Sequence, residues 1–323
     1  MKPNRSAILV ALLALVALAG CAGEQKQQVL TAESTPLIAR EVLFGNPDRA
    51  AARISPDGNS ISFLAPVDGV LNVWVGPAED PSSARPVTHD ADRGIRIHFW
   101  AYDGKHVVFL QDKGGDENWR VYAVNLESGE TRDLTPLEGV QARIESVSHL
   151  HPGEILVSLN DRNPQLHDIY RVDLATGDRK LVEQNDQGWM GYVVDDAFQV
   201  RLASRLTPDG GSETFRKMDG AWTPFLKVGA EDMMTTGPAG FDKTGQTLYM
   251  MDSRNRNTSA LVAIDMESGA EKEIASDPRA DIDAVMMHPV EKTVEAAAFN
   301  YLRKEWKVLD DAVRPDLEFL RTV

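Results

Sequence analysis

The sequence of 323 residues contains a single cysteine, which cannot form an intramolecular disulfide. It also has no apolar run long enough to cross a bilayer as a helix, because the longest, residues 7–19, is shorter than the roughly 20 residues required. Basic residues number 34 against 49 acidic ones, and the formal net charge is −15. An acidic surface repels phosphates, so we expect no nucleic-acid partner. Without disulfides, the fold must be stabilised by a packed core.

The amino-terminal segment has the order of an export signal. Lys2 and Arg5 precede the apolar run, which ends in Leu-Ala-Gly-Cys at residues 18–21. This ending resembles the lipobox of bacterial lipoproteins, whose cysteine receives a diacylglyceryl group and becomes the first residue after cleavage. We therefore expect a signal peptide at residues 1–20 and lipid attachment at Cys21. An ordinary cleaved signal with a chance cysteine is the alternative.

The lipoprotein resemblance also implies a location. The residue after Cys21 is Ala22 and not an aspartate, and the sorting pattern of lipoproteins then implies the outer membrane. We expect a protein of the cell envelope that is lipid-anchored and faces the periplasm. Residues 21–36 are polar and lack hydrophobic periodicity, which predicts a flexible tether between the lipid and a domain at residues 37–323.

The chain after the tether repeats itself at a period of roughly 45 to 50 residues. A turn that ends in a small residue and glycine marks each copy, with clear examples ending at Gly129, Gly177 and Gly269. Each copy also has an earlier turn, such as Ser-Pro-Asp-Gly at 55–58, and short strands of alternating polarity, such as 120–124. Asp-Gly and Ser-Gly pairs supply the positive φ angles that tight turns need.

About four short strands per repeat predict the blades of a β-propeller, an all-β fold. We expect six blades, at about residues 50–90, 95–136, 143–184, 190–229, 236–277 and 283–310. A solenoid is the alternative, but the sequence shows no capping helix for its ends. Residues 314–320 begin a further element. We therefore expect either a sixfold ring with a tail or an incomplete seventh blade in a truncated chain.

Two segments resemble the propeller of prolyl-oligopeptidase-family serine peptidases, in particular the bacterial dipeptidyl-aminopeptidase and acylaminoacyl-peptidase-like members. One is PLIAREVLFGNP at 36–47, which leads into ISPDG at 54–58, and the other is DKGGDENWRVY at 112–122. The resemblance extends over about residues 36–320. It implies that the full-length protein carries an α/β-hydrolase domain after the propeller, with a serine in a Gly-x-Ser-x-Gly turn followed by an aspartate and a histidine.

No Gly-x-Ser-x-Gly sequence occurs in this chain, so no catalytic residue of the family is carried over to it. The residues alone leave open whether the chain belongs to an enzyme. In the family the propeller covers the catalytic cleft and restricts substrates to peptides, and the resemblance implies that gating role here. The alternative is a stand-alone, lipid-anchored propeller, similar to TolB, that binds proteins or peptides in the cell envelope.

The densest polar loop, with Asp112, Asp116, Glu117 and Asn118, is the candidate peptide-contacting site. If the strands of each blade run A to D from the centre outward, the A–B turn and the C–D hairpin share one end of the blade. The 112–118 loop joins B to C and lies at the opposite end. The family resemblance implies that carboxylates there could hold a peptide's amino terminus. The alternative is a solvated turn in which Asp and Asn side chains cap backbone amides.

We expect no metal and no cofactor. His149 and His151 are two residues apart and would share one face of a strand, but Pro152-Gly153 follows and no nearby acid or histidine completes a ligand set. The pairs Gly114-Gly115 and Gly210-Gly211 lack the strand-to-helix context of phosphate-binding loops. The family resemblance and the TolB-like alternative both imply a peptide or protein ligand.

Overall fold

The structure is a computed structural model that describes residues 37–322. The predicted signal peptide, the tether and Cys21 lie outside the described residues. The chain divides into two compact units at Gly45. In the first unit, α2 (Arg40–Phe44) is a five-residue helix with no buried side chain. The second unit, from Asn46 onward, contains every described strand.

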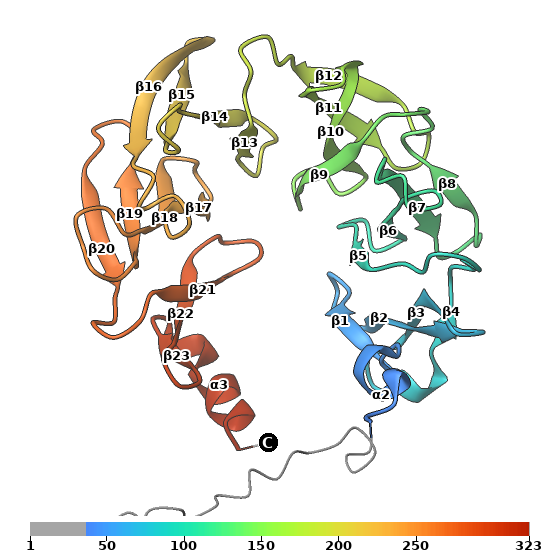
Figure 1. Ribbon diagram of the computed structural model, residues 1–323. Helices are drawn as coiled ribbons and strands as arrows, with labels where there is room; N and C mark the ends of the chain where they lie inside the picture. The colour runs from blue at the N-terminus through green and yellow to red at the C-terminus, as the bar shows by residue number, and fades with distance from the viewer. Residues whose placement is uncertain (1–36, 323) are drawn as a thin grey trace, which may run out of the picture. The chain divides into compact units, whose positions relative to one another are not determined.

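The second unit is a β-propeller of six antiparallel sheets arranged around a common centre (Figure 1). The first three blades are β1 (Ala50–Ile54), β2 (Ser60–Val67), β3 (Val70–Pro77) and β4 (Arg85–Pro86); β5 (Ile97–Trp100), β6 (His106–Gln111), β7 (Arg120–Asn125) and β8 (Thr131–Asp133); and β9 (Ala142–Val147), β10 (Glu154–Asn163), β11 (Leu166–Asp173) and β12 (Arg179–Glu183). A short 3₁₀ turn, η1 (Pro81–Ser83), precedes β4.

The other three blades follow at the same spacing. They are β13 (Gly191–Val194), β14 (Val200–Leu206), β15 (Ser212–Met218) and β16 (Ala221–Val228); β17 (Gly237–Phe241), β18 (Thr247–Asp252), β19 (Ala260–Asp265) and β20 (Glu271–Ala275); and the three-stranded sheet β21 (Ile282–Met287), β22 (Val294–Asn300) and β23 (Lys304–Val308). The predicted all-β propeller and its six blades are confirmed, and the arrangement around a centre excludes the solenoid.

The chain continues after the sixth blade as two helices. They are η2 (Asp311–Val313) and α3 (Arg314–Leu320). Pro315 stands in the first turn of α3, where its missing N–H is tolerated. The further element expected at residues 314–320 is therefore a helix and not a strand of a seventh blade.

Every blade is a meander, so the strand order fixes which turns lie together. Each sheet pairs its strands in sequence order, first to second to third, and to a fourth where one is present. The A–B turns and C–D hairpins consequently share one end of the propeller, and the B–C loops lie at the other, as the sequence predicts. The repeat at Gly129, Gly177 and Gly269 is the C–D hairpin, where each glycine N–H donates to the carbonyl four residues earlier at 2.8–2.9 Å.

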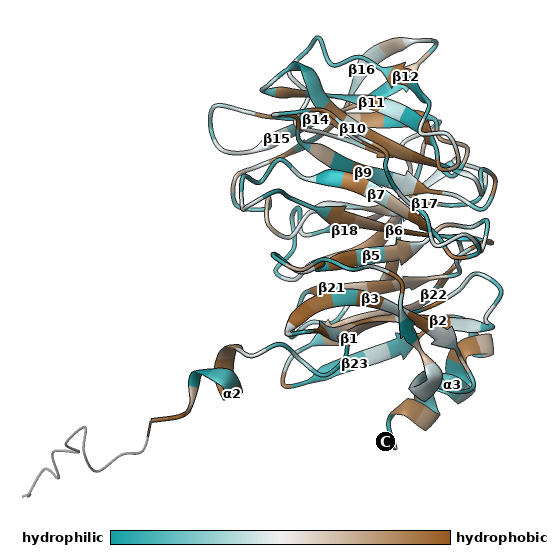
Figure 2. Ribbon diagram, turned by 90° about the vertical axis from the view of Figure 1, so that its right-hand side faces the viewer, coloured by the Kyte–Doolittle hydropathy of each residue, from teal (hydrophilic) through white to brown (hydrophobic). Residues whose placement is uncertain are grey.

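The core consists of apolar clusters at the junctions between successive blades. Five such clusters join the six blades in order, from blade 1 with blade 2 to blade 5 with blade 6. In the cluster between blades 2 and 3, for example, Val108 and Val121 pack with Ile155 and Val157, all with no exposed surface. Figure 2 shows the apolar residues along strands such as β5, β6 and β18, with mostly polar loops at the edges. No such cluster within residues 37–322 joins the sixth blade to the first.

A buried polar contact also crosses the first junction. His98 on β5 is 1% exposed, and its Nε2 lies 2.9 Å from the hydroxyl oxygen of Ser62 on β2. Burial, together with the nearby positive charge of Arg53, lowers the pKa of His98 to about 4. The neutral imidazole is therefore part of the folded state.

This burial makes the stability of the propeller depend on pH. The unfolded state takes up a proton on His98 near pH 6.5 and the folded state only near pH 4, so stability is lost as the pH falls between these values. We expect this group alone to lower the free energy of unfolding by about 2 kcal/mol between pH 7 and pH 5. Urea unfolding at the two pH values should show a smaller pH effect in His98→Gln than in the control, exposed His89→Gln. Equal pH effects in the two variants would show that His98 is not buried in its neutral form.

Candidate functional site

The B–C loop of the second blade is anchored by Asp112. Its side chain is 2% exposed, and its carboxylate accepts hydrogen bonds at 3.3 Å from both Nε and an Nη of Arg93. The same carboxylate accepts the backbone N–H of Glu117 at 3.4 Å. Asp112 thus connects the loop to the segment before β5, and its negative charge is matched by Arg93.

Asp116 and Asn118 form the tip of the loop. One carboxylate oxygen of Asp116 accepts the backbone N–H groups of Asn118 at 3.0 Å and Lys113 at 3.3 Å, and the other accepts the Asn118 side chain at 3.2 Å. These bonds satisfy backbone donors that the turn would otherwise leave unpaired. They are the arrangement expected for a capped turn, and both residues shape the loop.

Glu117 is the residue of this loop whose carboxylate is available. It is exposed, and its side chain makes no hydrogen bond or ion pair with any residue of the described chain. Its φ of 57° places it in the left-handed region, which is unfavourable for a residue other than glycine. Bonds on both sides hold it there, since its N–H donates to Asp112 and its carbonyl accepts from Gln141 Nε2 at 3.1 Å.

The Glu117 carbonyl connects this loop to the innermost strand of the third blade. Gln141 precedes β9, and its side-chain oxygen accepts from Nε and an Nη of Arg143 at 3.2 and 3.1 Å. Two residues further along β9, Glu145 is partly buried, and burial raises its pKa. A carboxylate and a guanidinium on an inner strand therefore lie beyond the loop that presents Glu117.

The junction between blades 3 and 4 holds further polar atoms. His167 Nε2 and the Tyr192 hydroxyl are buried, and neither has a hydrogen-bond partner in residues 37–322. Burial, followed by the charge of Arg143, lowers the pKa of His167 to about 4, so its ring is neutral. Burial also raises the pKa of Tyr192, with the charge of Glu145 among the contributors. Buried polar groups without partners are suited to binding water or the polar groups of a ligand.

We define the carboxylate site as Glu117, Arg143, Glu145, His167 and Tyr192. It combines one exposed carboxylate and one partly buried carboxylate with the guanidinium of Arg143 and the uncharged side chains of His167 and Tyr192. Carboxylates bind ammonium groups, and the uncharged groups can pair with peptide amides. A serine–histidine contact within residues 37–322 lies elsewhere, between the Ser62 hydroxyl and the ring of His98. The other ring nitrogen of His98, Nδ1, has no hydrogen-bond partner among the described residues.

The two histidines considered as metal ligands have different partners. His149 Nδ1 lies 2.9 Å from a carboxylate oxygen of Asp196. His151 Nδ1 accepts a hydrogen bond from Arg171 at 2.9 Å, and its ring stacks on Phe198 at 4.7 Å between centroids. In the part of the chain that the structure describes, no three His, Cys, Asp or Glu side chains are grouped as metal ligands.

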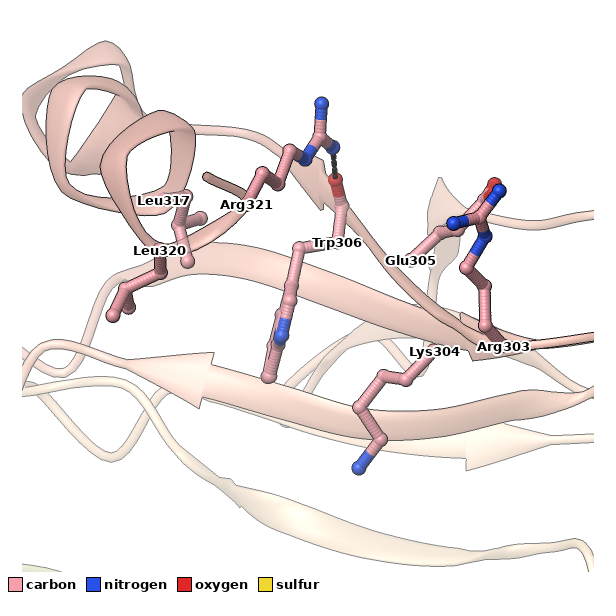
Figure 3. A pocket seen from close by; sticks show the side chains of 7 residues that line it. All are labelled: Arg303, Lys304, Glu305, Trp306, Leu317, Leu320 and Arg321. Carbon is pink, nitrogen blue, oxygen red and sulfur yellow. Dashed lines mark hydrogen bonds between the residues drawn. The ribbon is translucent and has the colours of Figure 1, made fainter. Parts of the chain in front are cut away.

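A cavity of about 610 Å³ lies on the sixth blade. As Figure 3 shows, Trp306 and Lys304 of β23 and Leu317 and Leu320 of α3 are among its lining residues. Trp306 pairs with Ala298, whereas the junction with blade 5 uses the alternate residues Ala297 and Phe299. The cavity is therefore on the face of the sheet that points away from blade 5, and it is separate from the carboxylate site.

The propeller is similar in sequence to two dipeptidyl peptidases. Over 290 residues the chain is 49% identical to dipeptidyl aminopeptidase BIII of Pseudoxanthomonas mexicana, which covers 90% of this chain and 42% of that protein. It is 32% identical over 302 residues to dipeptidyl peptidase family member 6 of Caenorhabditis elegans, which covers 88% of this chain and 40% of that protein. The chain is thus related to dipeptidyl aminopeptidases across its propeller, and the predicted resemblance is confirmed.

The other comparisons bear on the fold. One similar solved structure comes from a study of two prolyl endopeptidases. The alignment covers 78% of this chain and 39% of the endopeptidase chain, with a TM-score of 0.53 and 14% identity. This likeness shows the shared propeller alone. No family model matches the chain. The chain spans about two fifths of the length of the relatives it matches.

The sequence indicated the loop at 112–118 but not its neighbours. A sequence pattern could have indicated three of these neighbours. Polar and charged side chains alternate with other residues along an inner strand, where burial is expected, at Gln141, Arg143 and Glu145. The approach of Tyr192 to Glu145 depends on how two blades pack, and no local pattern contains that information.

The different environments of Asp112 and Glu117 give a test of this site. Asp112→Ala removes the acceptor of Arg93 and of the Glu117 amide, so we expect the free energy of unfolding to fall by about 1–3 kcal/mol. Glu117→Gln changes an exposed side chain and should alter it by less than about 0.5 kcal/mol. Urea unfolding with a common slope measures both. Equal losses in the two variants would contradict the assignment of Asp112 as the anchor.

Proposed function

We propose that this chain is the substrate-admitting propeller of an exported serine peptidase that removes dipeptides from the amino terminus of peptides. The observation that carries the proposal is the 49% identity to a dipeptidyl aminopeptidase along 90% of the chain. The proposed partner is an α/β-hydrolase domain of the same full-length protein, which supplies the nucleophilic serine, the histidine and the aspartate. The propeller restricts access to that domain and orients the peptide.

The carboxylate site supports a role in binding the peptide's amino group. Glu117 offers an exposed negative charge at the B–C end, held in a strained conformation. Glu145 offers a second carboxylate, whose pKa is raised by burial. A bound ammonium group would stabilise the ionised form of Glu145, so binding would release a proton in the pH range where free Glu145 is partly protonated. The free α-amino group is the feature that distinguishes an amino-terminal substrate from an internal peptide segment.

Substitution of both carboxylates tests this role in the full-length protein. Glu117→Gln and Glu145→Gln should each raise KM about tenfold for dipeptidyl substrates with a free amino group, which corresponds to about 1.4 kcal/mol of lost binding. Hydrolysis of an amino-terminally acetylated ester should change little. Glu79→Gln, an exposed carboxylate near the other end of the first blade, is the matched control. Unchanged KM in both variants would contradict amino-group binding at this site. If the unsubstituted full-length protein hydrolysed none of these substrates, the proposed peptidase activity would be wrong.

We also propose that the protein is anchored by a lipid on Cys21 and faces the periplasm from the outer membrane. The support is the Leu-Ala-Gly-Cys ending of the apolar run and the Ala22 that follows it. Within residues 37–322, no helix is long and apolar enough to cross a membrane.

Cys21→Ser tests the anchor directly. We expect the native protein to incorporate radiolabelled palmitate and to sediment with outer-membrane vesicles, and the variant to lose the label and appear in the soluble fraction. A thioether-linked diacylglyceryl group provides the binding that a single acyl chain gives only marginally. A native protein that incorporates no palmitate, or a variant that keeps the label, would contradict lipid attachment at Cys21.

A further inference from the structure

The A–B turns of two blades place bulky residues in a left-handed conformation for which three other blades use glycine. Gly58, Gly104 and Gly245 have φ values of 77°, 67° and 68° in the turns of blades 1, 2 and 5. In blades 4 and 6 the left-handed residues are Phe198, with φ 61°, and Lys292, with φ 53°. A side chain in this conformation is unfavourable by roughly 1 kcal/mol relative to glycine. The two side chains therefore merit an explanation beyond the turn itself.

The Lys292 side chain reaches a blade that is not its neighbour. Its Nζ lies 3.2 Å from one carboxylate oxygen of Asp196, which belongs to the A–B turn of blade 4. The other carboxylate oxygen lies 2.9 Å from His149 Nδ1 in the A–B turn of blade 3. The Asp196 side chain is 9% exposed, and those of Lys292 and His149 are each 21% exposed. The Asp196 carboxylate of the fourth blade thus lies between side chains of the third and sixth blades in a largely buried setting.

Other blades add to this arrangement. The ring of Tyr102, from the A–B turn of blade 2, meets the His149 ring edge to face at 6.1 Å. Burial and the charge of Asp196 raise the pKa of Tyr102. Lys243 of blade 5 pairs with Glu291 of blade 6 at 3.0 Å. Turns of five blades therefore come together at the A–B end.

A cavity places these side chains at the central channel. It has a volume of about 230 Å³ and is lined by residues of four innermost strands, including Val147, Val194, Gly240 and Met287. Asp196 and Lys292 also line it. Only the channel adjoins the innermost strands of four blades, so the ion pair lies across the channel near its A–B end.

We infer that Lys292, Asp196 and His149 form a latch that closes the A–B end of the channel and holds the sixth blade to the third and fourth. This contact matters for blade 6, because no apolar cluster of the described residues joins blade 6 to blade 1. With the latch closed, ligands enter the channel from the B–C end, where Glu117 lies. The latch is inferred from the positions of these side chains. Only the statement about where substrates enter the channel rests on the proposed function.

Hydrogen–deuterium exchange of the full-length protein tests the latch. Asp196→Asn and Lys292→Met should each speed exchange in β21 and β22 about tenfold, because blade 6 opens more often when the bridge is lost. The double variant should exchange no faster than the single variants, because both changes remove one interaction. Strands of blade 1 serve as the internal reference. Unchanged exchange in blade 6, or effects that add in the double variant, would overturn the latch.

Two further variants distinguish the latch from a neighbouring ion pair and from the backbone conformation of Lys292. Lys243→Met removes an ion pair whose side chains are about half exposed, and it should leave exchange in blade 6 unchanged. Lys292→Gly relieves the left-handed backbone but removes the latch. Faster exchange in that variant supports the latch, whereas unchanged or slower exchange means that Lys292 serves only the turn. Neither readout requires peptide hydrolysis, so a failure of the proposed function leaves this test intact.

Discussion

The four blades between the first and the sixth are apolar on both faces, so each of them depends on its two neighbours for burial. The five clusters between successive blades satisfy that requirement for the inner junctions, and they determine where every turn lies. Since the strands of a blade are antiparallel and in sequence order, the packing also separates the turns into two sets at opposite ends. The chemical character of each end follows from the residues that those turns carry.

The two ends of the channel differ in how their charges are used. At the B–C end, the charge of Asp112 is matched by Arg93, while Glu117 is left exposed and unpaired within residues 37–322. At the A–B end, Asp196 is paired with Lys292, lies beside His149 and is largely buried. An unpaired carboxylate can bind a cationic group, whereas the Asp196 carboxylate already has Lys292 as its partner. Glu117 at the B–C end and Lys292 at the A–B end both have a left-handed backbone conformation. At each position the side chain is placed at the end of the channel despite this unfavourable conformation.

The repeat made most of the fold predictable. Asp-Gly and Ser-Gly turns recur because tight turns need positive φ angles, and strand alternation then fixes the parity of the loops. That reasoning placed the 112–118 loop at the B–C end. It did not distinguish Asp112 from Glu117, because burial of Asp112 depends on Arg93 from the segment before β5.

Contacts between blades were the part that the sequence could not supply. Lys292 and Asp196 belong to different repeats, and only the curvature of the propeller brings them together. Residues 314–320 likewise gave no strand pattern, and Pro315 starts a helix there. Local patterns thus predicted the blades, while the carboxylate site and the latch arise from packing between them.

The central claim is that this propeller belongs to a serine peptidase, and labelling of the native protein tests it most directly. The protein would be precipitated from its own cells with an antibody to this chain and treated with a fluorophosphonate that reacts with activated serines. The account predicts one labelled species, recognised by the antibody, with a mass well above the 35.6 kDa of this chain. An unlabelled species near 35.6 kDa would contradict the account and leave a propeller that binds its ligand without hydrolysing it.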